Sequence, residues 1–380
     1  MKSRLYQPEH EMFRKSFRKY LKDNVLPNYD EWEKNGMVPP EAWEKAGENG
    51  FLCPALSEEY GGPGGDFLYS AVIQEEIGYH GVPGVFFAVH SDIVAPYIEK
   101  FAREDKKREW LPKCASGKCI LAVAMTEPEV GSDLARLTTT ARLEGGHYVV
   151  NGSKTFISNG QLAGLTVAAV RTRETPRPHD GISLLAVETG TPGFTKGRSL
   201  EKIGLHAQDT SEIFFNDCRV PVENLLGEEG QGFKYLMQNL QQERLIISLG
   251  AYGAAKGALD LTLDYVKKRK AFGKTIGAFQ NTRFVLAELA TKVQLARSFL
   301  DDLIPRHLSG EDVVAEVSMA KYWITEMQFN VADQCLQLFG GYGYMRESPI
   351  ARHFVDARVQ RIYGGTNEIM KELISRKLGL

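Results

Sequence analysis

One acidic residue of the 380-residue chain lies on an otherwise apolar helical stripe. Glu243 follows Leu240 by three positions and precedes Ile247 by four, so all three share one helix face. Burial disfavours the charged form of a carboxylate and raises its pKa, which suits proton abstraction near neutral pH. The alternative interpretation is that Glu243 only pairs with the adjacent Arg244, and helical spacing alone leaves both open.

Two segments in the middle of the chain carry groups that could bind a polar ring or a phosphate. Residues 126–133 leave a predicted strand, and Gly131 would let the backbone approach a ligand near the Thr126 and Ser132 hydroxyls. Residues 154–160 place an aromatic side chain beside a hydroxyl. Both segments are also compatible with purely structural roles, as a turn and as the end of a strand.

Three C-terminal segments have the same two interpretations. The glycines within 337–343 could cap a helix or admit a ligand, and they lack the βαβ context of a dinucleotide-binding fingerprint. The segment 363–366 precedes a predicted helix, with Thr366 as its N-cap and an N-terminus that can bind an anion. Residues 269–274 surround Phe272 with cations that are either solvated or part of a phosphate site.

The elements that must position these residues fall into three parts, so we predict an α+β fold with three domains. Residues 1–119 show helical spacing of apolar residues, and 120–228 show short β-branched and aromatic runs split by glycine turns. The second part predicts a small antiparallel sheet or barrel. Residues 229–380 carry three long apolar stripes, which predict an antiparallel helical bundle.

Composition excludes several classes of function. Forty-six basic against 48 acidic residues give a net charge of −2, which does not favour nucleic acid as a partner. No apolar stretch reaches the ~18 residues of a bilayer span, and we recognise no secretory signal. The odd number of scattered cysteines argues against a disulfide framework and for a reducing compartment, and no zinc-binding spacing occurs. The five cysteines are Cys53, Cys114, Cys119, Cys218 and Cys335.

Four stretches together resemble the acyl-CoA dehydrogenase family over nearly the whole chain. They are AMTEPEVGSDLA at 124–135, RKAFGK at 269–274, QLFGGYGYMRESPIARHFVD at 337–356 and IYGGTNEIMKELI at 362–374. The resemblance implies an N-terminal helical domain, a middle antiparallel β-domain and a C-terminal four-helix bundle. It also implies a cytoplasmic protein in a bacterium, or a processed protein of the mitochondrial matrix in a eukaryote.

By the same resemblance, the cofactor is a non-covalently held FAD at the junction of the domains. Thr126 would bond the pyrimidine side of the flavin, Phe156 would lie against the ring, and Ser158 would lie near the reactive nitrogen. Part of the site would come from a neighbouring subunit, which implies a homotetramer built as a dimer of dimers. The implied cofactor residues are Val123, Met125, Thr126, Gly131, Ser132, Phe156, Ile157, Ser158, Arg269, Phe272, Gln280, Gln337, Gly340, Gly341, Thr366 and Glu368.

The chain departs from the family pattern at the catalytic base. Many members have a glutamate directly before the Gly-Thr pair, where this chain has Gly364, which cannot accept a proton. Long-chain and isovaleryl members carry the base in a Glu-Arg-Leu context, which Glu243 matches. We therefore expect Glu243 to be the base. By similarity, the Gly364 N–H is one candidate donor to the substrate carbonyl oxygen, and a flavin ribityl hydroxyl is the other. The resemblance implies that substrate contacts come from Ser132, Arg244, Tyr363 and Gly365.

The implied reaction is FAD-dependent α,β-dehydrogenation of a medium- to long-chain fatty acyl-CoA to trans-2-enoyl-CoA in fatty acid β-oxidation. The implied electron acceptor is an electron-transfer flavoprotein. Alternatives are a branched-chain (isovaleryl) acyl-CoA dehydrogenase, a flavin monooxygenase or oxidase on the same scaffold, and a flavin-containing binding protein without turnover.

Overall fold

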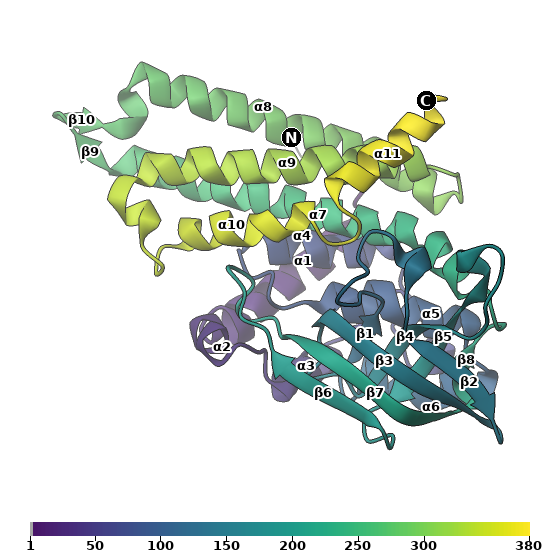
Figure 1. The fold of residues 1–380 in the computed structure, drawn as a ribbon. Helices are drawn as coiled ribbons and strands as arrows, with labels where there is room; N and C mark the ends of the chain where they lie inside the picture. The colour runs from purple at the N-terminus through teal and green to yellow at the C-terminus, as the bar shows by residue number, and fades with distance from the viewer. Residues whose placement is uncertain (1–2) are drawn as a thin grey trace.

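Helices form the first part of the chain, as the computed structural model of residues 3–380 shows (Figure 1). Proline at the first turn starts α1 and α3, where its missing N–H costs no bond. The Asp66 carboxylate accepts from the Leu68 N–H and caps α4. The helices are α1 Pro8–Tyr20, α2 Tyr29–Asn35, α3 Pro40–Glu48, α4 Phe67–Tyr79, α5 Ala95–Phe101 and α6 Glu104–Ala115.

The second part is an eight-stranded sheet of order β6-β7-β3-β2-β4-β5-β8, with β1 paired to β4. Most neighbours are antiparallel as predicted, but β1 and β2 each pair with β4 in parallel. Parallel pairing needs a long connection, and the chain between β1 and β4 supplies it. The strands are β1 Leu121–Ala124, β2 Thr140–Glu144, β3 His147–Ser158, β4 Leu165–Arg171, β5 Ile182–Glu188, β6 Phe194–Ser199, β7 Thr210–Pro221 and β8 Leu225–Leu226.

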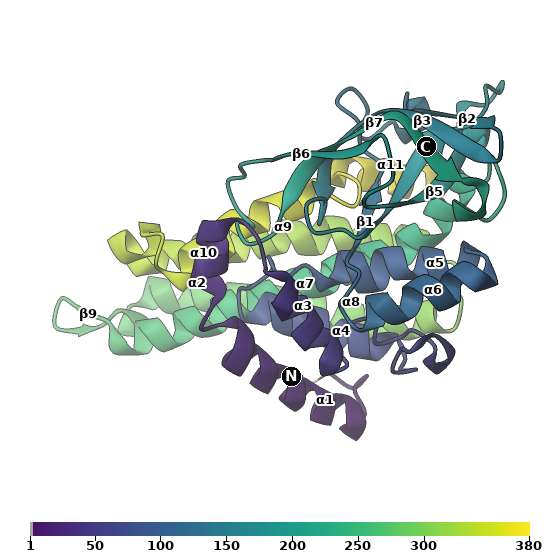
Figure 2. The same cartoon turned by 90° about the horizontal axis from the view of Figure 1, so that it is seen from below.

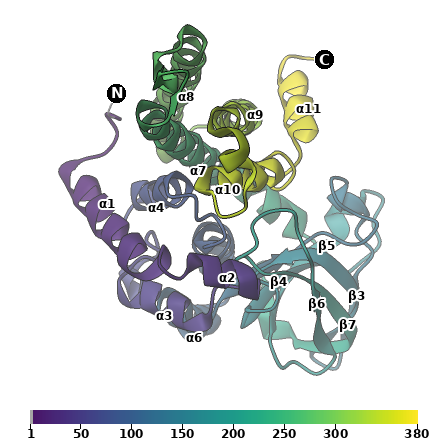
Figure 3. The same cartoon turned by 90° about the vertical axis from the view of Figure 1, so that its left-hand side faces the viewer.

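The third part is a bundle in which α7, α8 and α9 run side by side and α10 lies along them (Figures 1 and 3). A small hairpin joins α7 to α8 at one end of the bundle. The elements are α7 Gly232–Lys268, β9 Lys270–Ala271, β10 Lys274–Thr275, α8 Gln280–Leu308, α9 Val314–Phe339, α10 Pro349–Ala357 and α11 Asn367–Lys377. Helices, mainly antiparallel sheet and helical bundle confirm the predicted fold class.

Glycines bring α4 of the first part into close contact with α7 of the bundle. A Cβ added at Gly78 would overlap the Gly250 carbonyl, and one at Gly253 or Gly257 would overlap backbone oxygens of Glu75 or Tyr79. Figures 2 and 3 both show α1 and α3 on one side of the molecule and the sheet on the other. The α4–α7 contact therefore ties the first part to the bundle beside the region where all three parts meet.

No helix within residues 3–380 combines the length and the apolar character that crossing a membrane requires.

Candidate active site

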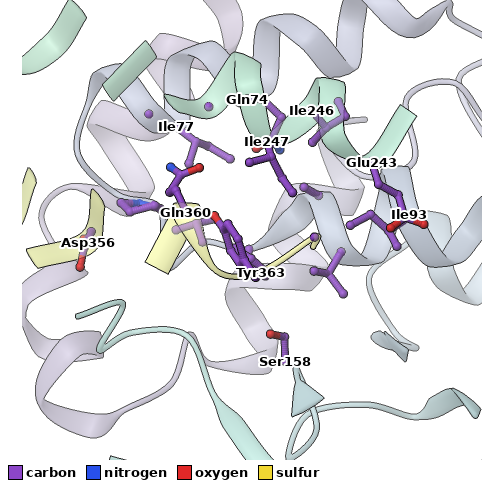
Figure 4. A pocket seen from close by; sticks show the side chains of 18 of the residues that line it. Gln74, Ile77, Ile93, Ser158, Glu243, Ile246, Ile247, Asp356, Gln360 and Tyr363 are labelled. Atoms are coloured by element: carbon purple, nitrogen blue, oxygen red, sulfur yellow. The ribbon is translucent and has the colours of Figure 1, made fainter. Parts of the chain in front are cut away.

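A cavity lies where the three parts meet, and most of its wall is apolar. Helices α4 and α7, the segment 81–93, the ends of β1 and β3, and the loop after α10 all contribute to the wall. Figure 4 shows Glu243 and Ile93 on one side of this cavity, Gln360 and Asp356 on the opposite side, and Tyr363 between them.

Glu243 is buried in the cavity wall, only 3% exposed, although it carries a carboxylate. The Tyr97 hydroxyl donates to its Oε1 at 2.7 Å. Burial raises the pKa of Glu243 to about 7, while the Tyr97 hydrogen bond and the Arg244 charge act in the opposite direction. A carboxylate with this pKa is available as a proton acceptor at neutral pH.

The alternative of an ion pair with Arg244 does not describe the observed contacts. Arg244 is buried, and its Nε donates to the Gly364 carbonyl oxygen at 3.4 Å. The hydrogen-bonding partner of Glu243 is instead Tyr97, on α5. Sequence reasoning missed Tyr97 because its partner is 146 residues away, although Tyr97 falls within the part of the chain predicted to be helical.

The loop from Tyr363 to Thr366 closes the cavity opposite α7. Gly364 and Gly365 have φ values of 64° and 89°, a left-handed backbone that disfavours other residues. A Cβ at Gly364 would also overlap the Ile247 side chain. The Thr366 hydroxyl accepts from the Ile369 N–H at 3.4 Å, which confirms its predicted N-cap.

Lys321, on α9, anchors this loop from behind and is fully buried. Its Nζ donates to the Gly365 carbonyl oxygen at 2.7 Å and to Asn367 Oδ1 at 3.0 Å. Burial and the nearby Arg244 charge lower the pKa of Lys321 to about 8. No motif marked Lys321, because its role depends on two helices that are adjacent only in the fold.

The residues expected to meet a flavin ring form the wall facing Glu243 and Tyr363. Phe156, near the end of β3, lines the cavity edge; it is 67% exposed and has a left-handed φ of 57°. Gly131 and Ser132 lie on an exposed loop and are not among the residues that line the cavity, and a Cβ at Gly131 would meet open space. The other lining members of this expected set are Val123, Met125, Thr126, Ile157 and Ser158.

The other residues expected to contact FAD are divided between two places, one expected to complete the flavin site and one expected to hold the adenosine-diphosphate half. Thr366 and Glu368 lie at the N-terminus of α11. The remaining members lie around the hairpin at the far end of the bundle in Figure 1, where Phe272 is 96% exposed. One chain does not bring these two sets together. The hairpin set includes Arg269, Gln280, Gln337, Gly340 and Gly341, of which all but Gln280 line a second cleft.

Comparisons with known proteins agree with this architecture. Family models of the acyl-CoA dehydrogenase N-terminal, middle and C-terminal domains match residues 7–118, 122–218 and 230–379. The long-chain specific acyl-CoA dehydrogenase of Sus scrofa mitochondria is 50% identical over 99% of this chain and 87% of its own. An acyl-CoA dehydrogenase of Bacillus subtilis is 38% identical over 97% and 98% of the two chains, so relatives include bacterial and mitochondrial proteins.

Solved structures give the same result. The crystal structure of acyl-CoA dehydrogenase from Geobacillus kaustophilus superposes with a TM-score of 0.98, at 54% identity over 100% of both chains. A glutaryl-CoA dehydrogenase of Mycobacterium smegmatis in complex with FADH2 has a TM-score of 0.92, at 28% identity over 99% and 95% of the two chains. The chain therefore belongs to the acyl-CoA dehydrogenase family of flavin-dependent oxidoreductases.

Proposed function

We propose that this protein dehydrogenates long-chain fatty acyl-CoA thioesters with FAD, and that Glu243 is its catalytic base. The observation that carries the proposal is the buried carboxylate of Glu243 on α7, which lines the cavity together with the residues expected to meet the flavin and has a pKa raised to about 7. Gly364 occupies the position where many family members have their glutamate, so the proton must be accepted from α7.

The α-hydrogen of a thioester is weakly acidic, and two groups of this chain make it removable. The Gly364 N–H would donate to the thioester oxygen and stabilise the developing enolate in a dry site. Glu243 would take the α-proton, since its carboxylate lies in the wall of the same cavity. FAD, when bound, supplies the oxidising chemistry by accepting the β-hydrogen as a hydride. The product is a trans-2-enoyl-CoA.

The residues that would hold FAD belong to two subunits of a homotetramer. Thr126, Phe156 and Ser158 would contact the ring, and the hairpin residues would reach the adenosine-diphosphate half on a partner subunit. The division of these two sets within one chain supports this arrangement. An electron-transfer flavoprotein would accept the electrons, and the exposed Phe156 edge leaves a route to it.

A long acyl chain is the substrate that best fits the depth of the cavity. Its wall follows α7 from Glu243 to Ala254, eleven residues or roughly 16 Å of helix. Small residues keep this path open, namely Gly78, Gly81, Gly250 and Ala254. The 50% identity to long-chain specific enzymes, against 35% to a short-chain specific one, supports the same choice.

The test is a panel of acyl-CoA substrates from C4 to C18, together with isovaleryl-CoA, mixed anaerobically with the purified flavoprotein. We expect bleaching of the flavin with the highest kcat/KM at long chains. If kcat/KM were highest with isovaleryl-CoA, the preferred substrate would be a branched-chain acyl-CoA instead. Rapid reoxidation of the reduced flavin by air would favour an oxidase or monooxygenase. A flavin that none of the substrates bleaches would indicate a flavin-containing binding protein without turnover.

The pH dependence of the reaction should report the ionisation of Glu243. Its carboxyl must be deprotonated to accept a proton, so kcat/KM should rise as pH passes through about 7 and level off above it. In Tyr97→Phe the ionised form loses a hydrogen bond, so the pKa should rise further, by less than about one unit. At pH 7 kcat/KM should then fall several-fold, while the plateau at high pH stays near the wild-type value.

The matched control is Tyr20→Phe, because the Tyr20 hydroxyl donates to the Ala42 carbonyl oxygen within the N-terminal helices, away from the cavity. Its pH profile should overlay that of the wild type. An unshifted profile in Tyr97→Phe would show that the rise in kcat/KM belongs to another group.

Lys321→Met should weaken catalysis by loosening the loop that presents the Gly364 N–H. Removing the ammonium leaves the Gly365 carbonyl oxygen without its donor, and a buried unsatisfied group costs about 1–3 kcal/mol. We expect kcat with a long-chain acyl-CoA to fall about tenfold or more in steady-state assays. Lys371→Met, which alters an exposed lysine over the Tyr322 ring on the same side of the bundle, is the control. Equal losses in both variants would contradict a specific role for Lys321.

A further inference from the structure

The side of the cavity opposite Glu243 is polar, although the wall between is apolar. Figure 4 shows Gln360 and Asp356 across from Glu243, with Ile77 near Gln360, whereas Gln74 lies closer to Ile246 and Ile247 of α7. Gln328 and His353 line this part as well. These five polar side chains come from α4, α9, α10 and the turn after α10, so only the fold brings them together.

These polar groups are buried and incompletely bonded. Each of the five residues is no more than 8% exposed. Four of their atoms have no hydrogen-bond partner among residues 3–380: Gln74 Nε2, Gln328 Oε1, Gln360 Oε1 and Asp356 Oδ2. The other Asp356 oxygen accepts from the Leu205 N–H at 2.6 Å. Unpaired buried polar groups are uncommon and costly, so members of this set are available to bind a polar group of a ligand.

The hydrogen-bonding groups of these five side chains limit which kind of ligand can bind beside them. Side-chain amides offer both a donor and an acceptor, and Asp356 adds an acceptor. A terminal methyl group would leave all of them unpaired. A carboxylate is disfavoured because the lining of the cavity offers it no cation: burial keeps His353 neutral by lowering its pKa to about 4, and Lys and Arg are absent from the residues of 3–380 that line the cavity. Burial also raises the pKa of Asp356 to about 7, so its ionised form would repel a second carboxylate above neutral pH. A hydroxyl both donates and accepts, and it carries no charge.

The distance is compatible with the far end of a fatty acyl chain. Gln74 lies next to Gly250, and Gly81 lies next to His353. Gly250 and Ala254 follow Glu243 by seven and eleven residues, which is roughly 10–16 Å along α7. An extended chain advances about 1.25 Å per C–C bond, so about eight to thirteen bonds beyond the α-carbon cover this span.

We propose that the distal end of the cavity is a hydroxyl-binding subsite, which makes acyl-CoA thioesters with a hydroxyl group near the ω end preferred substrates. The inference rests on the proposed function, because the reacting end of such a substrate must lie at Glu243. The subsite adds specificity at the tail and takes no part in the chemistry.

The experiment compares pairs of substrates of equal length with the holoenzyme. Dodecanoyl-, tetradecanoyl- and hexadecanoyl-CoA are each assayed beside their ω-hydroxy and ω-carboxy forms. We expect kcat/KM for the ω-hydroxy form to exceed that of the plain form at least fivefold at one or more lengths, and the ω-carboxy form to be the poorest. Calorimetric titration with the matching trans-2-enoyl-CoA products should show the same order of affinity.

The variant Gln328→Leu/Gln360→Leu tests whether these amides cause the preference. It should abolish the advantage of the hydroxyl and retain turnover of the plain substrate, whereas Ile77→Leu, an apolar change in the same cavity, should keep the advantage. If the enzyme turned over the plain substrates but showed no preference for the ω-hydroxy form at any length, the hydroxyl-binding subsite would be refuted and the proposed function would stand. Failure of every acyl-CoA to be oxidised would overturn the proposed function instead.

Discussion

Glu243→Gln should lower kcat/KM for a long-chain acyl-CoA by at least about a thousandfold and leave the bound flavin in place. General-base catalysis contributes about 10²–10⁴-fold, and no other carboxylate that lines the cavity lies beside Glu243. Glutamine is nearly isosteric and can still accept from Tyr97, so packing should be preserved. Anaerobic stopped-flow measurement of flavin bleaching isolates the chemical step from product release.

Asp260→Asn is a suitable control for this experiment. Asp260 lies on the same helix, where it accepts from the Tyr79 hydroxyl at 3.1 Å, and it does not line the cavity. We expect nearly wild-type bleaching in this variant. If Glu243→Gln bleached its flavin at a comparable rate, the base would have to be another group.

Gly253→Ala should be strongly destabilising, although it adds a single methyl group. The new Cβ would overlap the Glu75 carbonyl oxygen of α4, and backbone cannot move aside as a flexible side chain can. Overpacking costs about 1–3 kcal/mol and occasionally more, and we expect at least the upper end of that range here. The thermal midpoint should drop by at least about 5 °C, measured by differential scanning calorimetry.

Gly250→Ala gives the matched comparison on the same helix. Its Cβ would have Gln74 Oε1 as nearest neighbour at 3.8 Å, which is ordinary van der Waals contact. Because alanine favours the helix by about 0.5–1 kcal/mol over glycine, this variant should equal or exceed the wild-type midpoint. Equal midpoints for the two variants would mean that the α4–α7 contact is looser than the structure shows.

The sequence predicted those features that depend on local spacing. Glu243 was assigned to a buried helix face from Leu240 and Ile247, and the structure confirms its burial. The order of helices, sheet and helices and the N-cap at Thr366 were also predicted from local patterns, and the structure confirms both. The bounds of α6 could not be predicted, because its buried residues lie only in its last half and no continuous apolar stripe precedes Trp110.

The spacing of residues along the chain could not predict the contacts that act on the Glu243 carboxylate and on the loop at Gly365. Tyr97 and Lys321 act on Glu243 and Gly365 from helices distant in the chain. The parallel pairing of β1 with β4 was also out of reach, because alternation of side chains does not record the direction of a neighbouring strand. The assignments of FAD contacts came from the family resemblance and remain predictions.

The overlap between a side chain at Gly364 and Ile247 bears on how the family could have moved its base. Glutamate on the loop would need space that Ile247 fills, and a backbone conformation that glycine tolerates best. The atom that a new Cβ would meet is the terminal methyl group of Ile247, which a change of rotamer can move, so the positive φ of Gly364 is the larger obstacle. A chain could therefore acquire a loop glutamate while it still carries Glu243, at the cost of backbone strain at position 364.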